Sequence, residues 1–110
     1  MSFVTDDSAS AALEWLVKNA RTLGELKRQQ VLTESMTKRV KAIEMARSDA
    51  KTIAEKERDA LASEPYLEAI TAEASAAGAY EECRALKDAA MARIEAWRSL
   101  SATQRQLRAA

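Results

Sequence analysis

Hydrophobic residues recur three or four positions apart along most of the chain, which is the spacing of one face of an α-helix. In the first half this repeat weakens only near 27–37, where polar residues dilute it. Its members are Leu13, Leu16, Ala20, Leu23, Leu26, Met36, Val40, Ile43, Ala46, Ala50 and Ile53. The pattern predicts a helix over about 10–62 with Ser8 or Ser10 as its N-cap. A break near 24–30, which contains Gly24, is left open.

One clear helix boundary follows, at Ser63-Glu64-Pro65. Serine caps helices, and proline is tolerated in a first turn because its missing N–H has no partner there. A second helix is therefore expected over about 64–100. Its apolar face consists of Leu67, Ile70, Ala74, Ala77, Tyr80, Leu86, Ala90, Ile94 and Trp97.

The connection between the two predicted helices is short, so they must turn back on one another. The fold class expected is all-α, an antiparallel helical hairpin or coiled coil, as a single helical domain over 8–100. A flexible leader over 1–7 and a fraying tail over 101–110 flank it. With the bend at Ser63, the numbers of facing residues add up to about 126, which places Trp97 near Gln29 and Tyr80 near Ala46.

The first predicted helix is longer than the second, and its N-terminal part carries large apolar side chains without a partner. A lone two-helix hairpin also buries little surface. Both points predict a homodimeric helical bundle, with a three-helix monomer as the alternative. The candidate dimer contacts are Leu13, Trp15, Leu16 and Leu23.

Composition agrees with long helices. Alanine supplies 24 of 110 residues, whereas glycine and proline together supply three. Histidine is absent and Cys83 is the only cysteine, so one chain can form neither an internal disulfide nor a four-ligand Cys/His zinc site. No glycine-rich phosphate loop and no nucleophile–base pattern occurs. We therefore expect no enzyme activity, no cofactor, no metal and no small-molecule substrate.

Charge is balanced overall but not along the chain. Residues 18–41 carry seven basic and two acidic side chains, and the only charges in 97–110 are three arginines. The predicted hairpin would bring these stretches together at a basic open end. This suggests a contact surface for a nucleic-acid backbone or an acidic protein, although the sequence favours the alternative, an ordinary solvated helix face. The candidate contacts are Lys18, Arg21, Lys27, Arg28, Lys38 and Arg39.

Trp97, with Arg93 and Arg98, is the most distinctive cluster. Tryptophan and arginine dominate binding hot spots, so the three residues are the candidate contact for a partner protein. The alternative, which the residues favour, is that Trp97 fills the helix seam and the arginines extend over it. Cys83 is expected in the seam or on the surface, since the adjacent Glu81 and Glu82 do not favour a reactive thiol.

Four short runs give the chain a resemblance to a known group. They are Ala-Leu-Glu-Trp-Leu at 12–16, Glu-Arg-Asp-Ala at 57–60, Ser-Glu-Pro-Tyr at 63–66 and Ala-Arg-Ile-Glu-Ala-Trp-Arg-Ser-Leu at 92–100, followed by Ala102 and Arg105. In these the chain resembles small phage-encoded, alanine-rich helical proteins found among phage early and recombination genes. The resemblance implies a phage origin and supplies no catalytic residues.

The function expected is a non-enzymatic protein-interaction module, acting in the cytoplasm of the host cell. Its partner would belong to phage recombination or replication, or to a host defence complex that the protein inhibits. The alternatives are a nucleic-acid-binding accessory protein and a structural dimer or virion component. No membrane association is expected, since no apolar run reaches the length of a membrane span.

Overall fold

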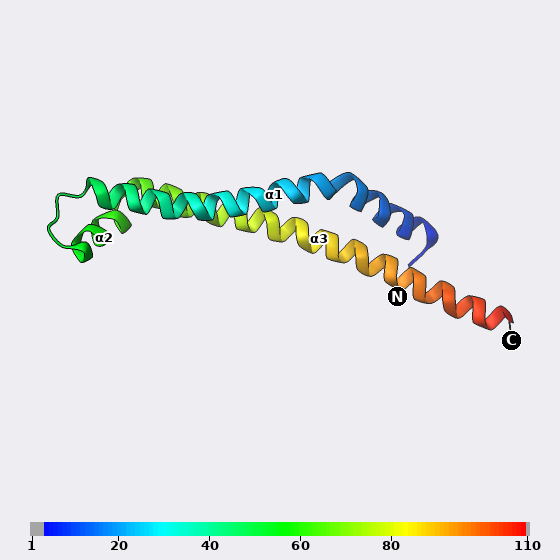
Figure 1. The fold of residues 1–110 in the computed structure, drawn as a ribbon. Helices are drawn as coiled ribbons and strands as arrows, with labels where there is room; N and C mark the ends of the chain where they lie inside the picture. Colours follow the sequence, from blue (N-terminus) through cyan, green and yellow to red (C-terminus); the bar gives the residue numbers. More distant parts are fainter. Residues whose placement is uncertain (1–3, 110) are drawn as a thin grey trace. The chain divides into compact units, whose positions relative to one another are not determined.

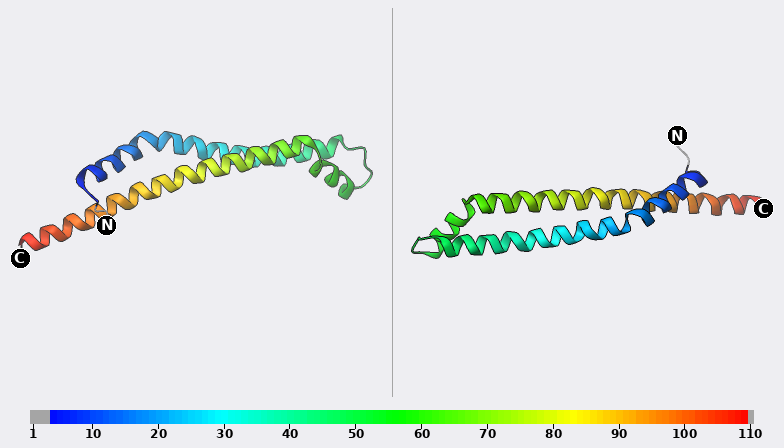
Figure 2. Two further views of the ribbon diagram at one scale, coloured as in Figure 1. Left: turned by 180° about the vertical axis from the view of Figure 1, so that it is seen from behind. Right: turned by 90° about the horizontal axis from the view of Figure 1, so that it is seen from above.

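The protein is built from three helices. The computed structural model describes residues 4–109, and within this range it contains α1 (Asp6–Arg47), α2 (Ile53–Leu61), α3 (Glu64–Ala109) and no strand (Figures 1 and 2). The polypeptide turns back between α1 and α3, so the two long helices run antiparallel. The predicted fold class, an all-α helical hairpin or coiled coil, is confirmed.

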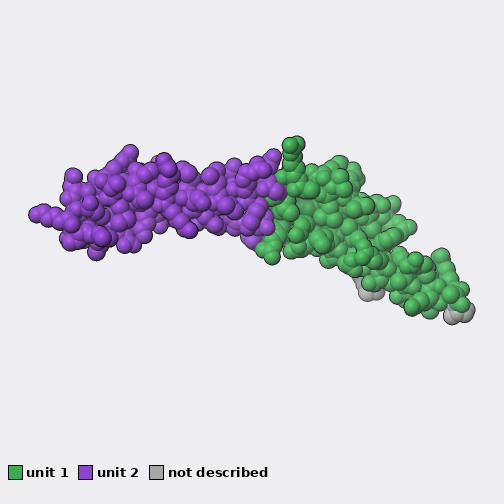
Figure 3. All heavy atoms as spheres, in the orientation of Figure 1, with its two compact units in different colours: residues 1–23, 82–110 green, residues 24–81 purple. Residues whose placement is uncertain are grey.

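The hairpin divides into two compact units, and each takes one part of α1 and one part of α3 (Figure 3). Unit 1 consists of residues 1–23 and 82–110, and unit 2 consists of residues 24–81, including α2. The sequence predicted one helical domain over 8–100. The division arises because each layer of a two-helix hairpin contacts only the layers next to it along the helices.

α1 differs from the predicted first helix at both ends. Thr5, rather than Ser8 or Ser10, caps it, and the Thr5 Oγ1 accepts a hydrogen bond from the Ser8 N–H at 3.1 Å. Residues 6 and 7 of the predicted leader are helical, whereas residues 1–3 lie outside the described residues. No break occurs at 24–30, because Gly24 is tolerated inside a continuous helix.

The break occurs instead at residues 48–52, so the predicted helix over 10–62 is two helices. Ser48 leaves the helix, and its hydroxyl donates a hydrogen bond to the Asp59 carboxylate at 2.5 Å. Thr52 then caps α2, and its hydroxyl accepts the Glu55 N–H at 3.2 Å. A threonine cap with glutamate three residues later is the spacing of a capping box, which starts a new helix.

α3 begins where the sequence predicted and ends later. The Ser63 hydroxyl accepts the Tyr66 N–H at 3.3 Å and donates to the Ala60 carbonyl at 2.6 Å. Ser63 therefore caps α3 and also ties it to the last turn of α2. The segment 101–109, predicted to fray, is helical, and Ala110 lies outside the described residues.

In unit 2 the least exposed residues of α1 and α3 alternate in steps of three and four, which is the seam of a coiled coil. They are Leu26, Gln30, Thr33, Thr37 and Val40 of α1, and Tyr66, Ala69, Glu73, Ala76 and Tyr80 of α3. Two contacts set the register. The Thr37 hydroxyl, which donates to the Thr33 carbonyl of its own helix at 3.0 Å, lies 3.4 Å from the Ala69 carbonyl oxygen, and the Lys27 ammonium lies 4.8 Å from the centre of the Tyr80 ring.

These contacts mean that the numbers of facing residues add up to about 106, and not to about 126. The predicted proximity of Tyr80 and Ala46 is therefore wrong. The same error applies to Gln29 and Trp97, since Trp97 lies against the start of α1. The physical reason is the position of the turn, which lies at 48–52 rather than at Ser63.

The seam of unit 1 follows the same spacing with different residues. They are Ala9, Ala12, Leu16, Asn19 and Leu23 of α1, and Cys83, Lys87, Ala90, Ile94 and Trp97 of α3. Ala12 and Ala90 are each 2% exposed, so the helix backbones approach closely there. Cys83 is buried in this seam, in agreement with one of the two placements expected for it.

Candidate interaction surfaces

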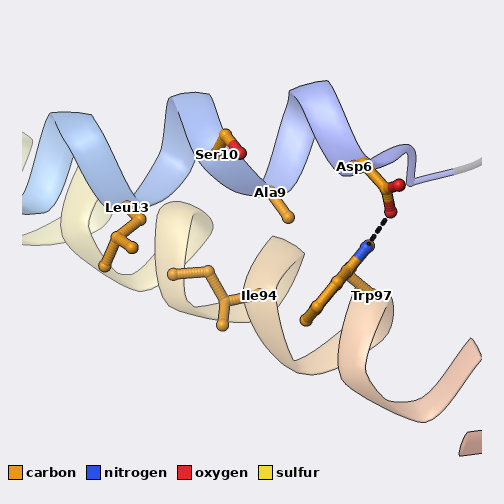
Figure 4. A pocket seen from close by; sticks show the side chains of 6 residues that line it. All are labelled: Asp6, Ala9, Ser10, Leu13, Ile94 and Trp97. Carbon is orange, nitrogen blue, oxygen red and sulfur yellow. Dashed lines mark hydrogen bonds between the residues drawn. The ribbon is translucent and has the colours of Figure 1, made fainter. Parts of the chain in front are cut away.

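Trp97 lies half-buried in the seam of unit 1, where its polar group is bonded to the opposite helix. The indole Nε1–H donates a hydrogen bond of 2.6 Å to the Asp6 carboxylate in the first turn of α1 (Figure 4). Beside this bond a shallow pocket of about 190 Å³ is lined by Ala9, Leu13 and Ile94. Trp97 is therefore a seam residue, as one of the two sequence interpretations expected, and part of its ring also borders open grooves.

One of these grooves is strongly basic. It continues from Trp97 along the face of α3 that points towards α1 in the preceding turns, and its volume is about 520 Å³. We call it the basic groove, and its lining residues are Asp6, Trp97, Arg98, Ser101, Gln104, Arg105 and Arg108. Because α1 begins at Asp6, no described helix covers this face of α3 beyond Trp97.

Arg93 is separated from the other two residues of the predicted partner-binding cluster. It lines a different groove, with Ala11, Trp15, Leu86 and neighbouring alanines. Arg98 belongs to the basic groove and forms an ion pair with Glu95 at 2.8 Å. The structure thus brings Trp97 and Arg98 together and places Arg93 on the other side of the seam.

Three of the four candidate dimer contacts pack within the chain. Trp15, Leu16 and Leu23 are half-buried against α3, and all three line a groove with Lys87. Leu13 is 57% exposed. Part of the apolar surplus predicted for the start of the first helix is therefore covered by α3 of the same chain, whereas Leu13 and Val17 are exposed.

The candidate nucleic-acid contacts are divided between the two units. In unit 1, Lys18 pairs with Glu14 at 2.8 Å, and Arg21 has an interaction partner of its own. In unit 2, Lys27 lies over Tyr80 and bonds to Gln30. The remaining candidates are exposed on α1; they are Arg28, Lys38 and Arg39.

The charge pattern of unit 2 also differs from the predicted basic open end. Its α1 segment 24–41 carries five basic and two acidic side chains. The α3 segment 64–81, which lies opposite, carries four acidic side chains and no basic one. The charge therefore alternates across this hairpin, from a basic α1 to an acidic α3. The predicted partner stretch over 97–110 belongs to unit 1.

Sequence reasoning missed two parts of these surfaces. Asp6 was assigned to a flexible leader, although an acidic residue after a threonine cap is typical of a first helical turn. Arg105 and Arg108 were assigned to a fraying tail. Their spacing from Arg98 and from Ser101, at seven residues each, is the signal that could have placed them along one helix face.

Among the described residues, no helix is long and apolar enough to cross a membrane, and no group of three or more metal-binding side chains occurs. Comparison of the chain with protein-family models, curated proteins and solved structures found no match.

Proposed function

We propose that this chain is a non-enzymatic protein-interaction module that binds a partner protein through the basic groove. The observation that supports this most strongly is the composition of the groove, in which one tryptophan edge and three arginines line a single open surface. Tryptophan and arginine are the residues most enriched at binding hot spots, because both offer large contact areas and directional hydrogen bonds.

The chemistry of the groove favours an acidic partner segment. Within residues 4–109, Arg105 and Arg108 form neither an ion pair nor a hydrogen bond through their side chains. Their guanidinium groups are free to bind carboxylates in the two-pronged geometry that arginine prefers. Trp97 offers an apolar surface beside them, so a segment with acidic residues next to an apolar one matches the groove best.

The resemblance to phage early and recombination proteins gives this proposal its biological setting. The partner would be an enzyme of phage recombination or replication, or a host defence complex that the protein inhibits. In the second case the arginine groove would cover an acidic surface that the defence complex needs for its own activity.

The test is a quantitative pull-down from infected cells with the full-length chain as bait. The Arg105→Glu/Arg108→Glu variant reverses two charges in the groove, and the Arg28→Glu/Lys38→Glu variant makes the same change of net charge in unit 2. We expect a partner that the first variant loses by about tenfold or more and the second retains, since each lost charged contact is worth roughly 1–3 kcal/mol. Equal retention by both variants would contradict the proposal.

Nucleic-acid binding is the second candidate, because Arg28, Lys38 and Arg39 are exposed and have no side-chain partner within the described range. Fluorescence anisotropy with single- and double-stranded DNA tests it. Micromolar binding that weakens steeply between about 50 and 200 mM salt would support this function. The same pair of variants should then respond in the opposite order, with Arg28→Glu/Lys38→Glu losing the DNA.

A further inference from the structure

One edge of unit 2 exposes large apolar side chains on α1 beside small ones on α3. Each of these residues comes immediately before a buried or half-buried residue of its helix, which is a seam residue in every case except Glu44. We call this edge the open face, and it consists of Leu32, Met36, Arg39 and Ile43 of α1 and of Glu68, Ala72, Ser75 and Ala79 of α3. All eight are exposed in the chain.

In an antiparallel helix pair, the residues that come directly before the seam positions of both helices lie on the same side of the pair. The reason is that one helix runs in the opposite direction, so the sense in which its residues follow one another around its axis is also reversed. Unit 1 shows this directly, since one groove is lined by Ala11, Trp15, Leu86, Ala89 and Arg93, which all come before seam residues. The opposite edge of unit 2 includes Lys41, which bonds to Glu57 of α2 at 2.9 Å.

The open face is complementary to itself in shape. On α1 the side chains of Leu32, Met36 and Ile43 form a ridge, with Met36 44% exposed. On α3, the small side chains of Ala72, Ser75 and Ala79 form a lower row beside this ridge. In a dimer with a two-fold axis, the ridge of each copy would pack against the row of small side chains of the other copy. This is the usual packing of helix ridges into grooves.

The open face is also complementary to itself in charge. Arg39 stands on the basic α1 and Glu68 on the acidic α3, and neither has a side-chain ion pair or hydrogen bond within residues 4–109. Their numbers add up to the same value as those of Lys27 and Tyr80, which contact each other across the hairpin. If a second hairpin repeats this register, Arg39 of one copy lies opposite Glu68 of the other.

The geometry points to a second copy of this chain as the occupant of the open face, in an antiparallel four-helix arrangement of unit 2. Four helices can enclose the ridge side chains, whereas within 4–109 no large side chain of the single hairpin is fully buried. This interface is independent of the basic groove, which belongs to unit 1. It also moves the expected dimer contact away from Leu13, Trp15, Leu16 and Leu23.

Sedimentation equilibrium of the full chain tests the association. We expect a mass of twice 12.1 kDa at micromolar concentration. Met36→Glu should weaken the dimer at least about thirtyfold, because it places a charge inside the apolar ridge. The matched control is Val31→Glu, on the same helix with 51% exposure but on the opposite edge, and it should leave the dimer unchanged.

A mixing experiment tests the register and depends only on contacts between chains. Arg39→Glu and Glu68→Arg should each weaken the homodimer about tenfold, since each brings two like-charged pairs together. An equal mixture of the two variants restores both opposite-charge pairs. Native mass spectrometry should therefore show the mixed dimer in excess over both homodimers, an effect that no contact within one chain can produce.

Three results would overturn the inference. They are a monomer of 12.1 kDa at all concentrations up to about 1 mM, equal sensitivity to Met36→Glu and Val31→Glu, and a statistical mixture of dimers in the mixing experiment. None of them bears on the partner captured by the basic groove, so the two proposals fail separately.

Discussion

The two units use the same helix spacing but place their apolar residues differently. In unit 1 the seam holds apolar residues such as Leu16, Leu23 and Ile94, and Trp97 closes its end. In unit 2 apolar seam residues such as Leu26 and Val40 alternate with Gln30, Thr33 and other polar residues, and large apolar side chains are exposed on the edges of both units. The comparison suggests that unit 1, where Ala12 and Ala90 are 2% exposed, is packed more closely within the chain than unit 2, whose seam carries more polar residues.

The largest expected difference in stability between the units comes from placing a charge in each seam. Ala90→Asp puts a carboxylate where the present residue is 2% exposed, and it should lower the stability of unit 1 by about 3 kcal/mol. Ala76→Asp, in the half-buried polar seam of unit 2, should cost about 1 kcal/mol or less. Hydrogen exchange resolved by residue measures both, and equal losses in the two units would remove the contrast.

A smaller effect is expected from the bond that closes unit 1. Trp97→Phe keeps an aromatic ring in the seam and removes the hydrogen bond to Asp6, which should cost about 1 kcal/mol, since the bond is exposed. Asp6→Asn, which retains an acceptor oxygen, is the conservative control and should cost less. Thermal unfolding followed by circular dichroism measures both, and a cost for Trp97→Phe no larger than for Asp6→Asn would show that the bond contributes little.

The sequence predicted the helices better than their register. Ser63 and Pro65 marked the start of α3 correctly because their cap chemistry is local. The turn at 48–52 was missed because Ala50 and Ile53 continue the apolar spacing across it. Thr52 and Glu55 carried the opposing signal, a capping box, and the structure shows that this local hydrogen bond starts α2.

The error in the turn explains most errors in the predicted sites. A shift of the bend by about ten residues changes the sum of facing numbers by about twenty, which is more than five helical turns of displacement between partners. The predicted basic open end depended on that register. Within the seam, Tyr80, Ala90, Ile94 and Trp97 were placed correctly, because they keep the strict three-and-four spacing.

Other residues were assigned to the wrong face of their helix. Leu67, Ile70 and Leu86 were expected in the seam, but they are exposed on its edges. Hydrophobicity alone favoured them over Ala69, Glu73 and Cys83, which occupy the seam. Periodicity cannot distinguish two neighbouring apolar stripes on one helix when only one of them meets a partner in the same chain.

The register of α1 against α3 is the central claim, and disulfide trapping measures it most directly. In a Cys83→Ser background, Thr37→Cys with Ala69→Cys should form an intrachain disulfide rapidly, because these residues face each other in unit 2. Ala46→Cys with Tyr80→Cys represents the alternative register, and its cysteines should lie about 30 Å apart along the helices. Rapid bridging of 37 with 69 and none of 46 with 80, read as intrachain bonds by mass spectrometry, is the predicted result; the reverse outcome would contradict the structure described for unit 2.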